Sequence, residues 1–264
     1  MSKPHSVWLP SYGRVMVEVM NEDHVDMMEK FDAGSNGEEQ TKFARENAWN
    51  FHSHCLATVF VVHDDIKIIS YFTLSPFIIR LKPENSLLDF DDEVIDKLET
   101  CAEQYDELKD PVQRIVQGVN RFRQTKHILE NIREVLKNNL TMDIHYSSVP
   151  SILLGQFGLQ KEYRYKALKE RFADKDINNL GGEILERIII PYAIRYGAEI
   201  GGIGLSLHAN KTVAKKFYLN PEKNPLAEDF YVVSFGGTYE LLYPFVDDVI
   251  GLRKWLLGND TREK

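Results

Sequence analysis

The chain has 264 residues, of which 43% are hydrophobic and 27% are charged, and its formal net charge is −8. These values are ordinary for a globular protein with a substantial core, and the negative charge argues against a protein that coats nucleic acid over its whole surface. No run of apolar residues approaches the ~18 that a membrane-spanning helix requires. The two cysteines, Cys55 and Cys101, lie far apart in sequence, so we expect a cytoplasmic protein without a disulfide framework.

The N-terminal part of the chain predicts one strand followed by two helices. Residues Arg14–Met20 alternate between apolar and polar side chains, as in a half-buried strand. Asn21 is a good N-cap for a helix that continues through His24–Phe31. Apolar residues spaced along one face of Glu38–Phe51 predict a second helix.

Two segments rich in β-branched and aromatic residues, Ala57–Val62 and Ile66–Leu81, predict strands joined by a hairpin turn at residues 63–65. Just before them, His52, His54 and Cys55 offer metal-ligating atoms. Their spacing suits neither one helix face nor one strand face, and no fourth ligand is evident, so we prefer a helix end without a metal.

Residues 82–148 form a connection that is too long for a structureless loop in a compact domain. The first half, Glu84–Asp110, is acidic and the second half, Pro111–Leu140, is basic, and both have helical periodicity. We expect a helical hairpin whose opposite charges face each other and water. The alternative is that the basic helix binds an anionic partner or a second subunit, as in a homodimer.

The centre of the chain combines a strand with the start of a helix. The nearly continuous apolar run Pro150–Gln160 predicts a strand buried on both faces, and Gly158 within it indicates a bulge or a close backbone approach. The predicted helix opens with Asn178, Asn179, Leu180, Gly181 and Gly182. The first N–H groups of a helix attract anions, so this start is a candidate phosphate site, although plain capping explains the same residues.

The last third predicts further helices and strands, with Gly197 as the cap of the long helix. The expected elements are a strand at 200–208, a helix at 210–219, a hairpin of 230–235 and 238–243, and a closing helix at 245–257. Glycines Gly201, Gly202 and Gly204 in the first of these strands indicate close approach of another backbone or of a ligand.

Four short motifs occur along the chain in a characteristic order. They are Phe31-Asp32-Ala33-Gly34, Ser70-Tyr71-Phe72-Thr73-Leu74-Ser75, Pro150-Ser151-Ile152-Leu153-Leu154-Gly155 and Ala214-Lys215-Lys216-Phe217-Tyr218. In this order they resemble the toxin-like branch of the GNAT superfamily of acyl-CoA-dependent acetyltransferases. The resemblance implies one α/β domain over residues 1–264, with a mixed, mostly antiparallel sheet of about seven strands, flanking helices, and residues 82–148 as an inserted helical hairpin.

The resemblance also implies a site and a reaction. Acetyl-CoA would bind as co-substrate, with its pyrophosphate at Asn178–Gly182 and its thioester carbonyl polarised by main-chain amides at Phe157, Gly158 and Leu159. Tyr218 would protonate the departing thiolate. His208 is a candidate general base, with a water relay as the alternative.

Two departures from the family pattern qualify this implied activity. Asp176 places a carboxylate where the pyrophosphate loop of the family has a cation or an amide, which at about 6 Å opposes the phosphates by roughly 3 kcal/mol. The inserted segment Lys161–Lys175 is either a basic lid that meets the cofactor's 3′-phosphate or an amphipathic surface helix.

The leading hypothesis is therefore acetyl transfer to a primary amine. The acceptor, a small molecule, a protein or an aminoacyl-tRNA, stays open. The alternative is a catalytically silent GNAT-fold protein that binds partners through its insertions.

Overall fold

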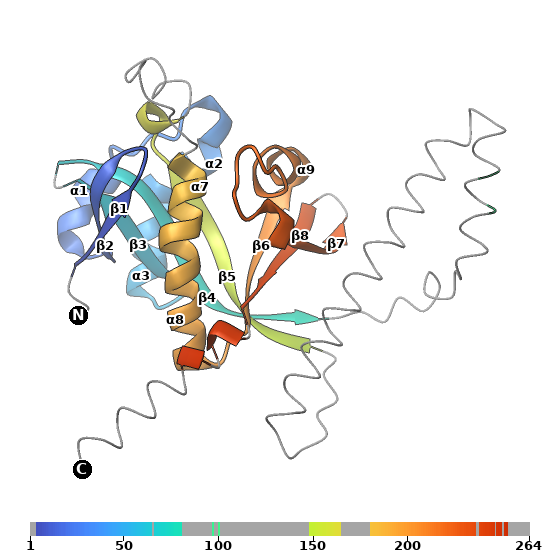
Figure 1. The fold of residues 1–264 in the computed structure, drawn as a ribbon. Helices are drawn as coiled ribbons and strands as arrows, with labels where there is room; N and C mark the ends of the chain where they lie inside the picture. Colours follow the sequence, from blue (N-terminus) through green and yellow to red (C-terminus); the bar gives the residue numbers. More distant parts are fainter. Residues whose placement is uncertain are drawn as a thin grey trace, which may run out of the picture.

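The computed structural model describes residues 4–64, 66–80, 97, 100, 148–164, 180–235, 238–245, 247–249 and 251–252 (Figure 1). The predicted helical hairpin of 82–148 and the homodimer through it fall almost entirely outside these residues. The same holds for Asn178, Asn179, Asp176 and most of the basic segment 161–175.

Eight strands of the described chain form one sheet in the order β1-β2-β3-β4-β5-β6-β8-β7. Their bounds are β1 His5–Leu9, β2 Gly13–Val19, β3 Thr58–His63, β4 Ile68–Arg80, β5 Ser148–Leu159, β6 Gly204–Asn210, β7 Tyr231–Phe235 and β8 Thr238–Pro244. All neighbouring strands are antiparallel except β5 and β6, which are parallel. This confirms the expected mixed, mostly antiparallel sheet, with β1 as an edge strand that the sequence did not predict.

Helices cover both faces of the sheet (Figure 1). On one face lie the short helices η1 Glu22–His24, α1 Val25–Met28, α2 Glu38–Lys42, η3 Phe43–Asn47 and α3 Ala48–Ser53. On the other face lies one continuous helix made of α7 Leu180–Ile184, η5 Leu185–Ile189 and α8 Ile190–Ile200. Other helical turns of the described residues are η2 Ser35–Gly37, η4 Lys161–Tyr163, α9 Lys211–Val213, η6 Ala214–Tyr218 and η7 Ala227–Asp229, and residues 247–249 and 251–252 are also helical. No described helix has the length and apolar character needed to cross a membrane.

Strand alternation divides the buried apolar residues between the two faces. The larger cluster packs the sheet against the long helix and includes Val17, Phe72, Leu154, Ile188 and Leu207. The smaller cluster packs the sheet against α1, η3 and α3 and includes Met28, Phe31, Ala48, Val61 and Tyr71. Each central strand therefore contributes to two cores, which explains its nearly continuous apolar sequence.

The long helix ends at a glycine, but this glycine is Gly201 and not the predicted Gly197. Gly197 lies inside α8, and the helix continues to Ile200 and ends at Gly201, whose φ is 101°. The prediction that Gly197 is the cap is wrong because its lack of a side chain serves packing: a Cβ there would lie 2.4 Å from the carbonyl oxygen of Gly202. A Cβ at Gly202 would lie 2.6 Å from Ile152 and 3.2 Å from the main chain of Ser151 in β5. This confirms a close approach at Gly202, whereas a Cβ at Gly201 would meet no atom within 4 Å.

Candidate functional site

Strand β5 is paired along its whole length on one edge and along only part of the other. It pairs with β4 from Ser148 to Leu159, but it pairs with β6 only over Ile152–Leu154. No described strand pairs with its second edge from Gly155 to Leu159. Figure 1 shows β5 and β6 diverging toward the end of the sheet at which α7 begins. This open edge is the candidate site.

A bulge lies where the two strands part. Gly155 and Gln156 together face the single residue Thr73 of β4, because the register shifts between Phe72 and Leu74. The main-chain N–H of Gln156 donates to the Thr73 hydroxyl oxygen at 2.8 Å. A bulge bends and twists its strand, and this one follows Leu154, the last residue paired with β6. The bulge expected at Gly158 is therefore at Gly155–Gln156, where it turns β5 away from β6.

Two of the three predicted β5 residues direct their main-chain groups to the open edge. The N–H of Gln160 donates to the carbonyl oxygen of Ile69 in the direction of β4, at 2.9 Å. Main-chain groups alternate in direction along an antiparallel strand, so those of Gly158 also face β4. Those of Phe157 and Leu159 then face the open edge, where a ligand amide or carbonyl can pair with them.

Gly158 has a different function. A Cβ at this position would lie 2.4 Å from the Tyr71 ring. That ring cannot easily move, since its hydroxyl donates to the carbonyl oxygen of Gln40 at 2.7 Å and it packs against Phe31 and Phe43. Burial also raises the pKa of Tyr71. Gly158 thus makes room for a buried ring.

The motif residues 31–34 anchor the end of the open segment. The Asp32 N–H donates to the side-chain oxygen of Gln160 at 2.7 Å, and the Lys161 N–H donates to the Asp32 carbonyl oxygen at 2.8 Å. The Lys161 ammonium lies 2.6 Å from the Asp32 carboxylate and lowers the pKa of that carboxyl. The same carboxylate accepts from the N–H of Gly34, whose φ is 74°. The motif therefore fixes the position of residues 160 and 161, which follow directly after β5.

The described part of the long helix starts at Leu180, and the predicted opening residues Asn178 and Asn179 lie outside the described residues. Leu180, Gly181 and Gly182 form its first turn and are buried. The Glu183 carboxylate, also in this turn, accepts from the main-chain N–H of Ser11 at 3.1 Å and so is directed toward the β1–β2 turn. A carboxylate in the first turn is favourable to the helix dipole. Gly181 and Gly182 carry no side chain on this part of the helix.

Tyr218 is buried within an aromatic group. Its ring packs against Phe217 and Phe230, with centroids 4.9 and 5.8 Å away. Phe217 in turn lies 6.2 Å from Phe157 at the open edge. Burial raises the pKa of the Tyr218 hydroxyl, which makes it a weaker acid. Phe217 therefore contacts both the Tyr218 ring and the side chain of Phe157 on the open half of β5.

His208 lies on the other face of the sheet. The preceding residue, Leu207, belongs to the same apolar cluster as Tyr218, and successive side chains of a strand point to opposite faces. The His208 ring is about half exposed, its Nε2 lies 3.7 Å from the Glu240 carboxylate, and it meets the edge of Phe77. The structure therefore does not bring His208 and Tyr218 together.

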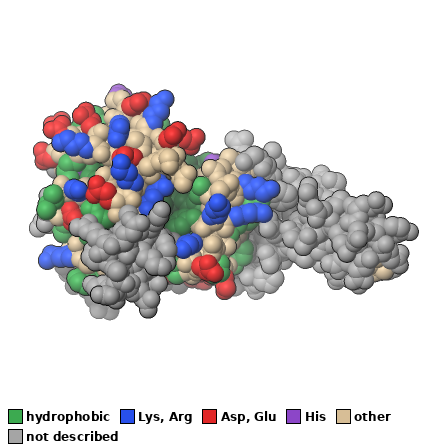
Figure 2. Space-filling model, turned by 90° about the horizontal axis from the view of Figure 1, so that it is seen from above, with side chains coloured by type: hydrophobic (Ala, Val, Ile, Leu, Met, Phe, Trp, Pro, Cys, Tyr) green, Lys and Arg blue, Asp and Glu red, His purple; other side chains and the backbone are tan. Residues whose placement is uncertain are grey.

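Basic side chains border an apolar recess on one side of the molecule. Figure 2 shows hydrophobic side chains in a recess between groups of Lys and Arg. The turn of α9 and η6, on the β6 side of the open edge, carries the exposed residues Lys211, Lys215 and Lys216. These cations provide a local positive surface in a chain of net charge −8, and such a surface attracts phosphates.

Sequence reasoning missed two hydroxyl residues that shape the site. Ser70 donates its hydroxyl to the carbonyl oxygen of Gly158 at 2.7 Å, and Thr73 holds the bulge. Both belong to the motif Ser70–Ser75, so the motif pointed to their segment. Their functions depend on which β5 residue lies opposite, and the sequence does not show that register.

No family model and no curated protein matches the chain by sequence. Solved structures match it by fold. A tyrosine-to-phenylalanine variant of the AtaT toxin has a TM-score of 0.50 and 13% identity, and the match covers 90% of this chain and 93% of that chain. A similar variant of KacT has a TM-score of 0.48 and 14% identity over 90% of this chain and 98% of that one. The structure of AtaT with acetyl-methionyl-tRNAfMet has a TM-score of 0.46 and 12% identity, over 87% and 94%.

At this level of identity the likeness concerns the fold. The chain has the GNAT-like fold of the AtaT structure, as the order of its motifs indicated.

Proposed function

We propose that the chain is an N-acetyltransferase that moves an acetyl group from acetyl-CoA to a primary amine. The observation that carries the proposal is the open edge of β5, where Phe157 and Leu159 direct main-chain groups away from β4 beside the divergence from β6. An extended ligand that contains amides, such as the pantetheine arm of CoA, pairs with such an edge as an added strand.

The chemistry assigns a task to each part of this edge. A neutral amine attacks the thioester carbon, the C–N bond forms, and the carbonyl oxygen becomes an oxyanion that an N–H of Phe157 or Leu159 stabilises. The C–S bond then breaks, the thiolate takes a proton, and the amine loses one. Gly181 and Gly182 at the start of α7 would hold the diphosphate of the cofactor.

The proton donor is the least direct part of the proposal. We retain Tyr218 as the acid, with the condition that a bound cofactor reaches its hydroxyl beside the Phe217 ring, which packs against both Tyr218 and Phe157. His208 faces the other side of the sheet and acts as base only for an amine that arrives from that side, and a water relay is the alternative.

AtaT has been solved with acetyl-CoA and with acetyl-methionyl-tRNAfMet. For the present chain we keep three classes of acceptor, namely a small amine, a protein amine and an aminoacyl-tRNA. The second candidate function is a GNAT-fold binding protein without catalysis. The burial of Tyr218 between Phe217 and Phe230, with its raised pKa, favours that candidate.

Calorimetric titration with acetyl-CoA tests the proposal. We expect binding by the native chain, its loss in Gly181→Trp, and its retention in Gly251→Trp, since a Cβ at Gly251 meets no atom within 4 Å. Circular dichroism checks that each variant is folded. Thiol release with the three classes of amine then identifies the acceptor, and Tyr218→Phe tests the acid. Absence of heat with the native chain would overturn the transferase in favour of the binding protein.

A further inference from the structure

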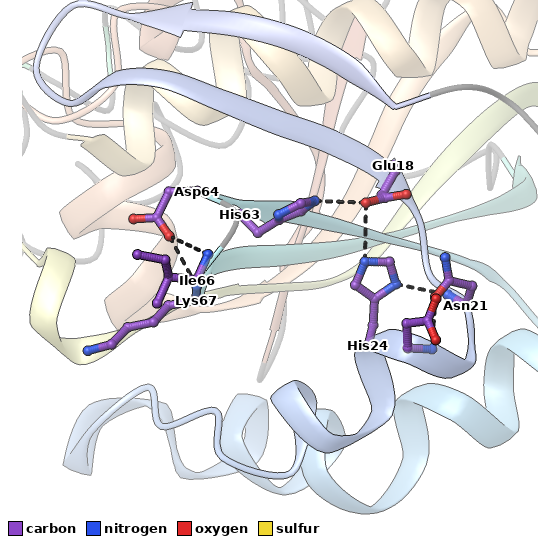
Figure 3. A network of polar contacts seen from close by, with 8 residues as sticks. Glu18, Asn21, His24, His63, Asp64, Ile66 and Lys67 are labelled. Carbon is purple, nitrogen blue, oxygen red and sulfur yellow. Dashed lines mark hydrogen bonds and ion pairs between the residues drawn. The ribbon is translucent and has the colours of Figure 1, made fainter.

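Two histidines and a glutamate meet on the sheet face that α1, η3 and α3 cover, away from the open edge of β5. Glu18 lies on β2, His63 ends β3, and His24 is in the short helix η1 (Figure 3). Glu18 is opposite Val61 in the β2–β3 register, so His63, two residues further, points to the same face. The side chains of Glu18, His24 and His63 are 17%, 6% and 12% exposed.

Their polar atoms converge on one point. The Nε2 atom of His63 lies 2.8 Å from a carboxylate oxygen of Glu18, and the Nε2 atom of His24 lies 3.3 Å from the same oxygen. One ligand atom from each of the three residues lies within 4.8 Å of the others. Atoms bound tetrahedrally to zinc at ~2.0–2.2 Å are separated by roughly 3.3 Å. The fold thus already brings the three side chains close to the spacing of a metal site.

We propose that Glu18, His24 and His63 bind a divalent transition-metal ion, with Zn²⁺ as the best fit. Two imidazole nitrogens and one carboxylate oxygen form a set that zinc prefers, whereas Mg²⁺ and Ca²⁺ prefer oxygen ligands alone. The carboxylates of Glu22 and Asp23 in the same turn add negative charge around the site. The partial exposure of Glu18 and His63 leaves a fourth position for water.

One hydrogen bond of His24 competes with the metal. Its Nδ1 atom accepts from the main-chain N–H of Asn21 at 3.0 Å, within the cap that begins η1. The proton of the neutral ring is therefore on Nε2, where it serves the bond to Glu18. A metal at Nε2 removes that proton and moves the tautomer to Nδ1–H, so the bond to Asn21 is lost. Loss of a cap bond changes an equilibrium constant by about tenfold. The free energy of zinc coordination is larger than the free energy of this bond.

The ion would stabilise a part of the fold that is separate from the open edge of β5. It would join β2, β3 and the turn from which α1 leaves the sheet, and α1 supplies Met28 to the smaller core. Because binding displaces the cap bond, the turn 21–24 would change conformation when the ion binds. This inference does not depend on the proposed transferase activity.

Metal titration of the chelator-treated full chain tests the site. We expect one Co²⁺ per chain with the strong visible absorption of a four-coordinate ion, its displacement by Zn²⁺, and a higher melting temperature with Zn²⁺. Glu18→Gln and His63→Gln should each weaken binding by at least tenfold, because a three-ligand site then has two ligands. The matched control is His54→Gln, an exposed histidine outside the cluster, which should bind as the native chain does.

A measurement on the native chain avoids dependence on the folding of the variants. Long-range ¹H–¹⁵N spectra should show two of the eight histidines with Nε2 shifted to the metal-bound range and Nδ1 protonated. Absence of a Co²⁺ spectrum at excess metal would overturn the proposal. So would binding that survives in Glu18→Gln and His63→Gln but is lost in His54→Gln, because the ion would then be at the segment 52–55.

Discussion

The two halves of β5 have the same neighbour on one side and different surroundings on the other. The half from Ser148 to Leu154 pairs with β4 and, at its end, with β6, and it buries Ile152 and Leu154 in the larger core. The half from Gly155 to Leu159 pairs with β4 alone. A single bulge at Gly155–Gln156 separates the two. The comparison shows that one strand can supply both the core and an unpaired edge for a ligand when a local irregularity divides it.

The paired half should be the more sensitive to loss of apolar volume. Ile152→Ala removes a fully buried side chain that packs against Gly202, and we expect the free energy of unfolding to fall by about 3 kcal/mol. Urea denaturation measures this. The control is Ile78→Ala on β4, whose side chain is 59% exposed and whose loss should change stability by less than about 0.5 kcal/mol. Equal losses in the two variants would show that the burial of Ile152 is not the cause of its effect.

The open half should be the more sensitive to added volume. Gly158→Ala places a Cβ against the anchored Tyr71 ring, and we expect a loss of about 2 kcal/mol, with a changed near-ultraviolet circular dichroism spectrum from the displaced ring. Gly251→Ala, in open space at a helical position, should be neutral or stabilising. If Gly158→Ala were as stable as the native chain, the ring would not be the reason for this glycine.

Removing one of two buried serine hydroxyls, Ser70 or Ser206, tests the hydrogen bond between β4 and the open half of β5. Ser70→Ala removes the bond to the Gly158 carbonyl, and we expect a loss of about 1 kcal/mol by urea denaturation. Ser206→Ala on β6 is the matched change, since this buried hydroxyl has no hydrogen-bond partner in the described structure. The second variant should be neutral or slightly more stable. A larger loss of stability for Ser206→Ala than for Ser70→Ala would contradict the stabilising hydrogen bond assigned to Ser70.

The smallest expected effect on stability concerns the ion pair between Asp32 and Lys161 at the end of β5. The folded pKa of Asp32 lies below its ordinary value of 3.8 because Lys161 pairs with it. Its contribution to stability is therefore present above that ordinary value and is lost as the pH falls through the lowered pKa. Lys161→Met should return the pKa toward 3.8 and remove this part of the acid dependence. Carboxyl titration by NMR measures the shift, and an unchanged Asp32 pKa in the variant would contradict it.

Elements with strong local patterns could be predicted from the sequence. The hairpin of β3 and β4 was predicted correctly, and so was the helix expected at Glu38–Phe51, which the structure extends to Ser53. Their composition and periodicity are local properties. Strand β1 was missed, since within His5–Leu9 only the last residue is buried and no alternation is visible. The choice between Gly197 and Gly201 as the cap failed because both are glycines, and only the packing against Gly202 distinguishes them.

The arrangement of the candidate site depends on contacts that the sequence does not show. Residues 157–159 lie on the part of β5 that does not pair with β6, and the direction of each N–H depends on the register between β4 and β5. The burial of Tyr218 depends on Phe230, which lies in a different element. Glu18 and His63 are far apart in sequence, so no local motif predicted that they would lie close together. Each missed feature arises from contacts between distant segments.

The pairing of Arg80 with Ser148 closes the outer end of the β4–β5 hairpin. A segment inserted between these two residues therefore has its two ends side by side. Loop-closure entropy rises by only about 0.6 kcal/mol for each doubling of loop length. Evolution can therefore lengthen, shorten or exchange the segment 81–147 at this joint with little effect on the rest of the sheet, and a protein engineer can graft a foreign module at the same place.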